Sequence, residues 1–462
     1  MAYRSKQIFT RNHQVELSKW NLDNRVLLRI NETGFENIHH MHNMMRTDLN
    51  LFLALIHCYS LEEHCFIIGH RRIVPTLEDV LRIMGLPIDG KAVTGKDFER
   101  TETEELCYEL LGDTRYISGR SGTEISLKGL RENLQYIPRD SEDIDIYVRA
   151  YVLHGIGCLI CPSMNPSGVS SMFLGLLRNI DELKNFAWGA AFLAQSMNQV
   201  RHLKTNIDSA TTTGACIPFF MVFLFEHVNG LTNASMRLNQ IHFELPIEFP
   251  LLVSWSFLLV NKSKNNHGKL SVETFLHFLE RSEILPRPYN RLDFAFLPPY
   301  LRSHLHVAYT HTVLICFEQL THHKPHIFPE KMGLEQRDIG EIHSLPKPSS
   351  KQRKAAEKPD WALKFNKHVA FWNNRTNHFI CSYDKLIELG VVGENEDEEA
   401  GNEDDDEEAE NEDDDGDDEE GVDEDDQAGD EDDDGLRRRN LSMPWKKRII
   451  EIDTNKTKAP NA

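Results

Sequence analysis

The sequence predicts a mainly helical α+β protein: a helical domain with a small β-hairpin, followed by a disordered tail that is first acidic and then basic. Apolar residues recur at helical spacing through much of residues 41–393, and two short β-type runs flank a Gly-His pair within them. Residues 394–434 hold 29 Asp and Glu and no Lys or Arg, a charge density that cannot collapse into a core.

The net charge of −22 is concentrated in this tail. Residues 435–462 carry eight Lys and Arg against two acidic residues, whereas residues 1–393 carry 43 Lys and Arg against 42 Asp and Glu. The body is therefore electrically balanced and lacks the basic excess of a dedicated DNA-binding domain, so direct DNA contact would require a local patch. No membrane partner is expected, because the longest apolar runs fall short of the ~18–20 residues of a span. Eight cysteines without a secretory signal favour reduced thiols inside the cell.

The stretch PTLEDVLRIMGLPIDG, residues 75–90, predicts a capped helix. Thr76 is a good N-cap, Asp79 stands at the capping-box spacing, and Glu78 adds a negative charge near the positive helix end. Gly85 can take the left-handed conformation that ends a helix. The apolar face repeats at helical spacing through Leu77, Val80, Leu81 and Met84. None of these residues indicates a catalytic site, so the unit is interpreted as part of the scaffold.

The other elements follow from periodicity and composition. They are an N-terminal extension at 1–40, a helical face within 41–64, hairpin strands at 65–68 and 73–74, an irregular insertion at about 91–145, two helices within 170–200, a buried helix at 219–228, an extended connector at 287–303, an apolar element at 306–323, a basic linker at about 344–360 and a closing helix at 361–380.

Read in this order, the segments resemble the plant mobile domain, also called the aminotransferase-like plant mobile domain. EEHCFIIGHRRIVPTLEDVLRIMGLPIDG aligns without a gap with the family's ETHTFHLPCGECTITLEDVALLLGLPIDG. Further blocks keep the family order: YVRAYVLHGIGCLICPS, FAWGAAFLA, RPYN, LICFEQLTHHKPHIF and HVAFWNNR. The likeness covers about residues 40–380. We therefore expect a plant mobile domain-like body at residues 41–393.

The chain departs from the family pattern at several polar positions. Arg71 and Arg72 replace the hairpin Gly-Glu, and Met197 and Asn198 replace a Tyr-Arg pair. HIFPEKMG replaces the Arg-Val and Arg-Gln-Phe-Gly that follow a late proline in the family. The resemblance implies a nuclear protein of the Maintenance of Meristems type, linked to transposon silencing, gene expression and genome stability. It supplies no catalytic residue, and the aminotransferase label finds no lysine in a Schiff-base context.

Metal and acid–base candidates are few. Cys158 and Cys161 form one CxxC, but a structural zinc site needs four ligands and no second CxxC follows. Glu318 and His323 form a polar pair of unknown role, either an acid–base pair or a buried lock. Histidines cluster without a recognisable ligand spacing at His39, His40 and His42, at His304, His306 and His311, and at His322, His323 and His326. No cofactor and no metal are predicted.

The tail carries the clearest functional signal. A basic cluster in a segment too charged to pack is accessible to an import receptor. Its members are Arg437, Arg438, Arg439, Lys446, Lys447 and Arg448. The preceding acidic run resembles tails that shield basic partners such as histones or other chromatin proteins, with a purely solubilising role as the alternative.

The sequence therefore predicts a non-enzymatic nuclear interaction protein that acts in gene regulation, transposon silencing or genome stability. The alternatives are a transposon-derived, metal-dependent hydrolase or nuclease-like enzyme, and a protein that binds DNA directly. A cleft with convergent carboxylates or histidines would favour the enzyme, and a contiguous Lys/Arg stripe would favour DNA.

Overall fold

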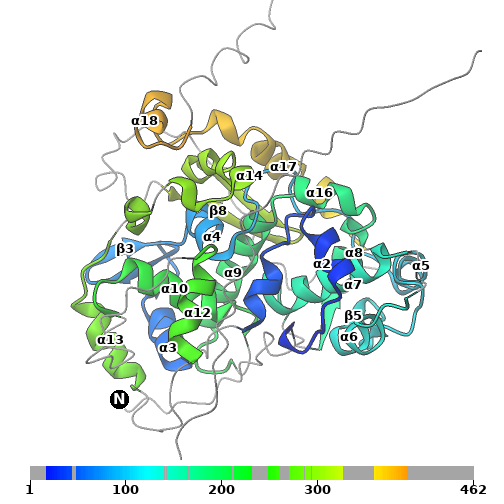
Figure 1. The fold of residues 1–462 in the computed structure, drawn as a ribbon. Helices are drawn as coiled ribbons and strands as arrows, with labels where there is room; N and C mark the ends of the chain where they lie inside the picture. Colours follow the sequence, from blue (N-terminus) through cyan, green and yellow to red (C-terminus); the bar gives the residue numbers. More distant parts are fainter. Residues whose placement is uncertain are drawn as a thin grey trace, which may run out of the picture. The chain divides into compact units, whose positions relative to one another are not determined.

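The computed structural model describes most of the body of the chain (Figure 1). The predicted acidic run and basic tail lie outside this part, as does most of the basic linker predicted at about 344–360. The described residues are 17–43, 48–139, 141, 143–163, 167–210, 213–231, 248–260, 270–285, 287–292, 294–325 and 358–392. Within them the predicted class is confirmed: helices dominate, with small antiparallel sheets beside them.

The described helices are mostly short. They are α2 (Asn24–Ile30), α3 (Leu49–His57), α4 (Leu77–Met84), α5 (Arg100–Leu111), α6 (Leu127–Leu134), α7 (Asp145–Gly155), α8 (Ser171–Leu176), α9 (Trp188–Thr205), α10 (Ile217–His227), α12 (Leu251–Val260), α13 (Val272–Glu280), α14 (Pro299–Arg302), α16 (Trp361–Lys364), α17 (Asn366–Asn373) and α18 (Tyr383–Glu388). A π-helical turn, Ile156–Ile160, continues α7, and 3₁₀ turns occupy Ile38–Asn43, Ile180–Asn185, Pro288–Arg291, Phe294–Phe296, Leu305–Tyr309 and Arg375–Asn377.

The predicted hairpin is confirmed, with its second strand at 71–73 rather than 73–74, and a third strand extends it. Ile68 pairs with Arg71 across Gly69 and His70, whose φ angles of 54° and 63° are those of a left-handed turn that matches strand twist. The strands of this sheet, in order, are β1 (Tyr59–Ser60), β2 (Cys65–Ile68) and β3 (Arg71–Ile73). A second three-stranded sheet consists of β4 (Ile117–Ser118), β5 (Glu124–Ser126) and β6 (Gly168–Ser170). A third sheet consists of β7 (Thr312–Cys316) and β8 (Gln319–His323).

Helix α4 forms as its sequence predicts. Thr76 and Asp79 make the reciprocal capping box, and Gly85 ends the helix with φ 63°. The turn after it packs on the first turn of α9, where the amide of Gly189 donates to the carbonyl of Pro87 at 2.7 Å. A Cβ at position 189 would lie 2.8 Å from Cγ2 of Ile88, so only glycine allows this close approach.

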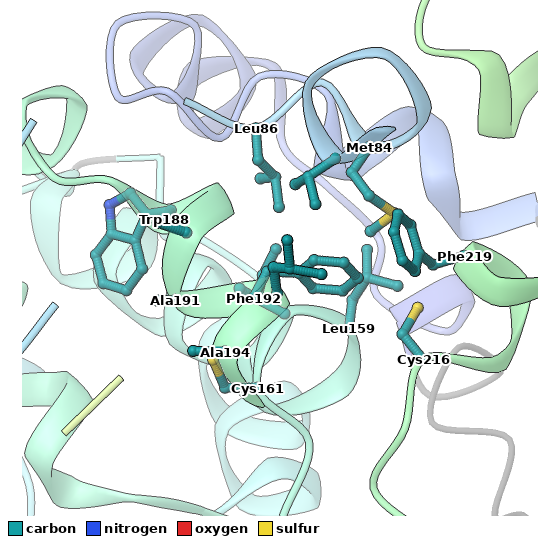
Figure 2. Close-up of a cluster of buried hydrophobic side chains, with 14 of the residues drawn as sticks. Met84, Leu86, Leu159, Cys161, Trp188, Ala191, Phe192, Ala194, Cys216 and Phe219 are labelled. Carbon is teal, nitrogen blue, oxygen red and sulfur yellow. The ribbon is translucent and has the colours of Figure 1, made fainter. Parts of the chain in front are cut away.

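The core forms where α4, α9, α10 and the π-helical turn meet. Helix α9 contacts α3, α4, β7 and β8, and Figure 1 shows it beside α4. Figure 2 shows the apolar side chains that fill this junction, drawn from segments far apart in sequence: Met84, Leu86, Leu159, Cys161, Trp188, Ala191, Phe192, Ala194, Cys216 and Phe219. The prediction that residues 219–228 are deeply buried is confirmed, because every residue of α10 is buried.

Three sequence predictions need correction. Residues 91–145, expected to be irregular, contain α5 and α6, which bury a narrow stripe that includes Leu106, Leu110 and Leu130. The connector expected to be extended at 287–303 contains 3₁₀ turns and α14. The closing helix is two helices, α16 and α17. In the first two cases the polar or proline-rich composition hid helices and helical turns that gain stability from packing rather than from local propensity.

Candidate functional site

Helix α4 carries charged side chains into the interior. Glu78, Asp79 and Arg82 are 5%, 1% and 3% exposed. From the sequence, Glu78 and Asp79 were interpreted as charges that favour the helix N-terminus, a role that does not require burial. Charged side chains are almost never this buried without partners, so other parts of the chain must supply them.

Asp79 accepts hydrogen bonds with both carboxylate oxygens. Oδ2 accepts from the amide of Thr76 at 2.7 Å and from its hydroxyl at 2.8 Å. Oδ1 accepts from the hydroxyl of Tyr289 at 2.5 Å and lies 2.7 Å from Nε2 of His227 at the end of α10. Burial opposes ionisation of Asp79, but His227, Tyr289 and the Thr76 amide outweigh it, so the pKa of Asp79 lies below its ordinary value.

His227 contacts an oxygen atom with each ring nitrogen. Nδ1 lies 2.8 Å from the carbonyl oxygen of Leu285, which can only accept, so Nδ1 carries a hydrogen. Nε2 lies 2.7 Å from Oδ1 of Asp79. The side chains of His227 and Asp79 are only 5% and 2% exposed, so water has little access to this contact.

Glu78 forms the second centre of this buried network. Arg287 donates to both carboxylate oxygens, from Nε at 3.2 Å and Nη2 at 3.3 Å. Arg82 donates from Nε at 2.9 Å, and the hydroxyl of Tyr309 donates at 3.3 Å. Burial would raise the pKa of Glu78, but the two guanidinium groups outweigh it and hold the pKa below its usual range. Each guanidinium also lies over a tyrosine ring, Arg82 over Tyr289 at 5.3 Å and Arg287 over Tyr309 at 5.6 Å.

Glu226, next to His227, completes the network. The indole Nε1 of Trp255 on α12 donates to it at 2.7 Å, and Arg291 donates to its other oxygen. The three buried carboxylates therefore bind α4 to α10, α12, the turn at 287–291 and the turn before β7. Because each carboxylate already contacts a basic side chain and a neutral donor, none is available as a general base, and the network acts as a structural lock.

The turn after α4 is held by the end of the body. The indole Nε1 of Trp372 on α17 donates to the carbonyl of Gly90 at 2.9 Å, and Arg375 donates from Nε to Asp89 at 2.8 Å. The guanidinium of Arg375 lies 4.6 Å from the ring of Trp372. The residues IDG and HVAFWNNR, which carried part of the resemblance, thus meet directly.

A cavity of about 240 Å³ lies beside the lock. His323 lines it and caps α4: its Nδ1 donates to the carbonyl of Thr310 at 2.8 Å, and its Nε2 accepts the amide of Leu77 at 3.1 Å. The other polar lining groups come from Tyr59, His64, Arg201, Thr321, His322 and Lys324. Met197, one of the departures from the family pattern, lies in the wall.

The structure separates Glu318 from His323. Glu318 is exposed in the β7–β8 turn, whereas His323 is buried at the far end of β8, where it pairs with Thr312. The interpretation of these residues as a polar pair is therefore wrong; His323 instead caps α4. The candidate import cluster Arg437, Arg438, Arg439, Lys446, Lys447 and Arg448 lies outside the described residues.

The two cysteines of the CxxC have different neighbours. The Sγ atom of Cys158 lies 3.6 Å from Nδ1 of His154, and that of Cys161 lies 3.7 Å from Sγ of Cys316 on β7. In the part of the chain that the structure covers, no group of three or more His, Cys, Asp or Glu is placed to hold a metal ion. Nor is any helix there long and apolar enough to cross a membrane.

Comparisons with known proteins agree with the sequence motifs. The family model described as plant mobile domain matches residues 34–390. In Arabidopsis thaliana the chain is 25% identical over 329 residues to Protein MAINTENANCE OF MERISTEMS, covering 71% of this chain and 65% of that protein. It is 24% identical over 379 residues to Protein MAIN-LIKE 1, covering 80% of this chain and 69% of that protein.

A further Arabidopsis thaliana relative carries an enzyme name. The chain is 24% identical over 390 residues to a protein named Serine/threonine-protein phosphatase 7 long form homolog, covering 81% of this chain. The chain spans only 28% of the length of that relative and 46% of Protein MAIN-LIKE 2. No solved structure matches the chain.

Proposed function

Because this chain belongs to the plant mobile domain family, we propose that it is a non-enzymatic nuclear interaction protein that acts in gene regulation, transposon silencing or genome stability. The name of one relative, Protein MAINTENANCE OF MERISTEMS, supports a role in meristem maintenance. The observation that carries the proposal is the saturation of the buried carboxylates at α4.

An enzyme that uses acid–base chemistry needs a titratable group that can reach a substrate. Glu78, Asp79 and Glu226 are instead buried and engaged by cations on other segments. They hold the motif blocks in one arrangement, which is what a rigid platform for a protein partner requires. The phosphatase name belongs to a relative of which this chain spans 28%, so the activity is not transferred.

Nuclear entry is proposed to depend on the basic cluster in the tail. A fluorescent fusion of the full chain is compared with variants that replace all six cluster residues by alanine, or that replace the basic residues of KPSSKQRK, 347–354. Loss of nuclear accumulation only in the first variant is expected. Accumulation that persists there, and is lost in the second, would assign import to the linker instead.

The proposed partner class of the acidic run is basic chromatin protein such as histones. Its attraction is screened over about 8 Å at physiological salt, so binding should weaken as salt rises. Because residues 435–462 are basic and compete for the acidic run, their removal should strengthen histone binding, and removal of 394–462 should abolish it. Equal histone binding by all three proteins would reduce the acidic run to a solubilising segment.

The non-enzymatic part of the proposal has its own test. The purified chain is assayed for hydrolysis of a phosphomonoester and of DNA with added divalent cations. No turnover above background is expected. Turnover that co-purifies with the folded chain and is abolished by a single substitution in the described body would overturn it.

A further inference from the structure

The cavity beside α4 has a cationic wall. Arg201 on α9 and Lys324 after β8 both line it, and no Asp or Glu belongs to its lining. Neither cation forms an ion pair with a carboxylate among the described residues, whereas the cations of the neighbouring lock are paired. The cavity thus holds two permanent positive charges that the described body does not neutralise.

One donor in this wall lacks an acceptor. Nη2 of Arg201 donates to the hydroxyl of Thr321 at 3.1 Å. Its Nε is buried and has no hydrogen-bond partner in the described part of the protein. A buried donor without a partner is costly, and an oxyanion in the cavity would satisfy it with a charge-assisted bond.

The potential in the cavity also acts on a neighbouring ring. The pKa of His64 lies below its ordinary value, first because of partial burial and then because of the positive charges of Arg201 and Lys324. Glu63, the adjacent acidic residue, is engaged by Arg72 and does not line the cavity. The local field therefore favours an anion.

Part of the wall is apolar. Val74, Leu193, Met197 and Leu314 face the same space, which is too large for an inorganic ion alone. A monocarboxylate would balance only one of the two cations, whereas a phosphomonoester carries about −1.5 to −2 at neutral pH. The hydroxyl groups of Tyr59 and Thr321 both bond to Arg201, and each still has a hydrogen that can be donated to a phosphate oxygen.

We propose that this cavity binds a phosphomonoester, with the phosphate on Arg201 and Lys324 and the organic group on the apolar wall. The phosphate can belong to a free small molecule or to a phosphorylated side chain of a partner protein. The site does not depend on the proposed nuclear role, since its chemistry is complete within the described body.

Calorimetric titration of the full chain tests the proposal. The probes are inorganic phosphate, phenyl phosphate, benzoate, and a short peptide with and without phosphotyrosine. Phenyl phosphate should bind more tightly than inorganic phosphate or benzoate. If the phosphopeptide binds more tightly than phenyl phosphate, the natural ligand is assigned to a phosphorylated partner protein. If phenyl phosphate binds more tightly than the phosphopeptide, the natural ligand is assigned to a free small molecule.

Substitutions locate the binding. Arg201→Met and Lys324→Met should each weaken phenyl phosphate binding by at least about tenfold, the expected loss of a charge-assisted bond. The matched controls Arg120→Met and Lys128→Met change exposed cations outside the cavity and should leave the affinity unchanged. Because Arg201 also bonds Thr321, thermal melting checks its fold, and Lys324→Met gives an independent variant.

Two results would overturn the site. One is the absence of measurable phenyl phosphate binding by the folded wild-type chain. The other is binding that Arg201→Met, Lys324→Met and the two controls weaken equally, which would indicate general surface charge.

Discussion

Asp79→Asn is expected to be among the most destabilising isosteric changes in the body. The side chain is 1% exposed, and its carboxylate contacts the amide and hydroxyl of Thr76, the hydroxyl of Tyr289 and Nε2 of His227. Asparagine removes the charge and turns an amide donor toward one of these donors. Breaking a buried ion pair on one side costs about 3–5 kcal/mol, a large fraction of the ~5–15 kcal/mol that stabilises a typical domain.

Urea unfolding followed by tryptophan fluorescence and circular dichroism measures this cost. The matched control is Asp181→Asn, whose carboxylate is 71% exposed and pairs with Arg29, and it should cost no more than about 1 kcal/mol. A further His227→Gln change in the Asp79→Asn background should recover part of the loss, because it removes the side chain that has lost its carboxylate partner. A loss below about 1 kcal/mol for Asp79→Asn would refute the buried ion pair.

The pH dependence of the stability tests the role of Asp79 independently. Because the pKa of Asp79 is lowered by folding, its contribution is present above the unfolded pKa, near 3.8, and is lost as pH falls through the folded value. The wild type should therefore lose stability in acid more steeply than Asp79→Asn. Parallel stability curves would contradict the assignment.

Three other predictions follow from single residues. Burial raises the pKa of Glu36 from 4.5 to about 7, so the ionised side chain destabilises the folded state increasingly as pH rises through that interval. The free energy of unfolding of Glu36→Gln should exceed that of the wild type by up to about 3 kcal/mol near pH 8 and by little near pH 4. A difference in urea midpoints that does not change with pH would contradict this. Gly189→Ala should lower the melting temperature, because the overpacking cost of about 1–3 kcal/mol exceeds the gain of ~1 kcal/mol in helix propensity; an unchanged or raised melting temperature would show that Ile88 moves aside. Burial raises the pKa of Cys58 to about 11 and of Cys107 to about 12. A thiol reagent near pH 8 should therefore label the native chain slowly, and should label all eight cysteines only after denaturation. Rapid labelling of several thiols in the native chain would be inconsistent with this burial.

The helix at 77–84 could be predicted to its ends because its determinants are local. Thr76 and Asp79 close a capping box three residues apart, and Gly85 supplies the left-handed residue that ends it. The turn at Gly69 and His70 is local in the same sense. Helix α10 was also recognisable, since a segment that is apolar on all sides has to be buried.

The buried network could not be predicted, because its partners are distant in sequence. Asp79 meets His227 and Tyr289 at separations of 148 and 210 residues, and Glu78 meets Arg287 at 209. In the sequence, each of these charges is equally compatible with an exposed position. The clue available was weak: two acids stand in the first turn of a helix whose surroundings are strongly apolar.

Glu318 and His323 illustrate the opposite error, because closeness in sequence suggested a contact that the fold does not make. The strand direction carries His323 to the open end of the hairpin, while Glu318 stays in the turn. The cavity likewise depends on tertiary structure, since α9, β8 and the segment before α4 contribute its wall. The sequence by itself determined the caps, the turn and the apolar helices, whose interactions span a few residues. Only the tertiary structure decided which charges are buried together, because that depends on how distant segments pack.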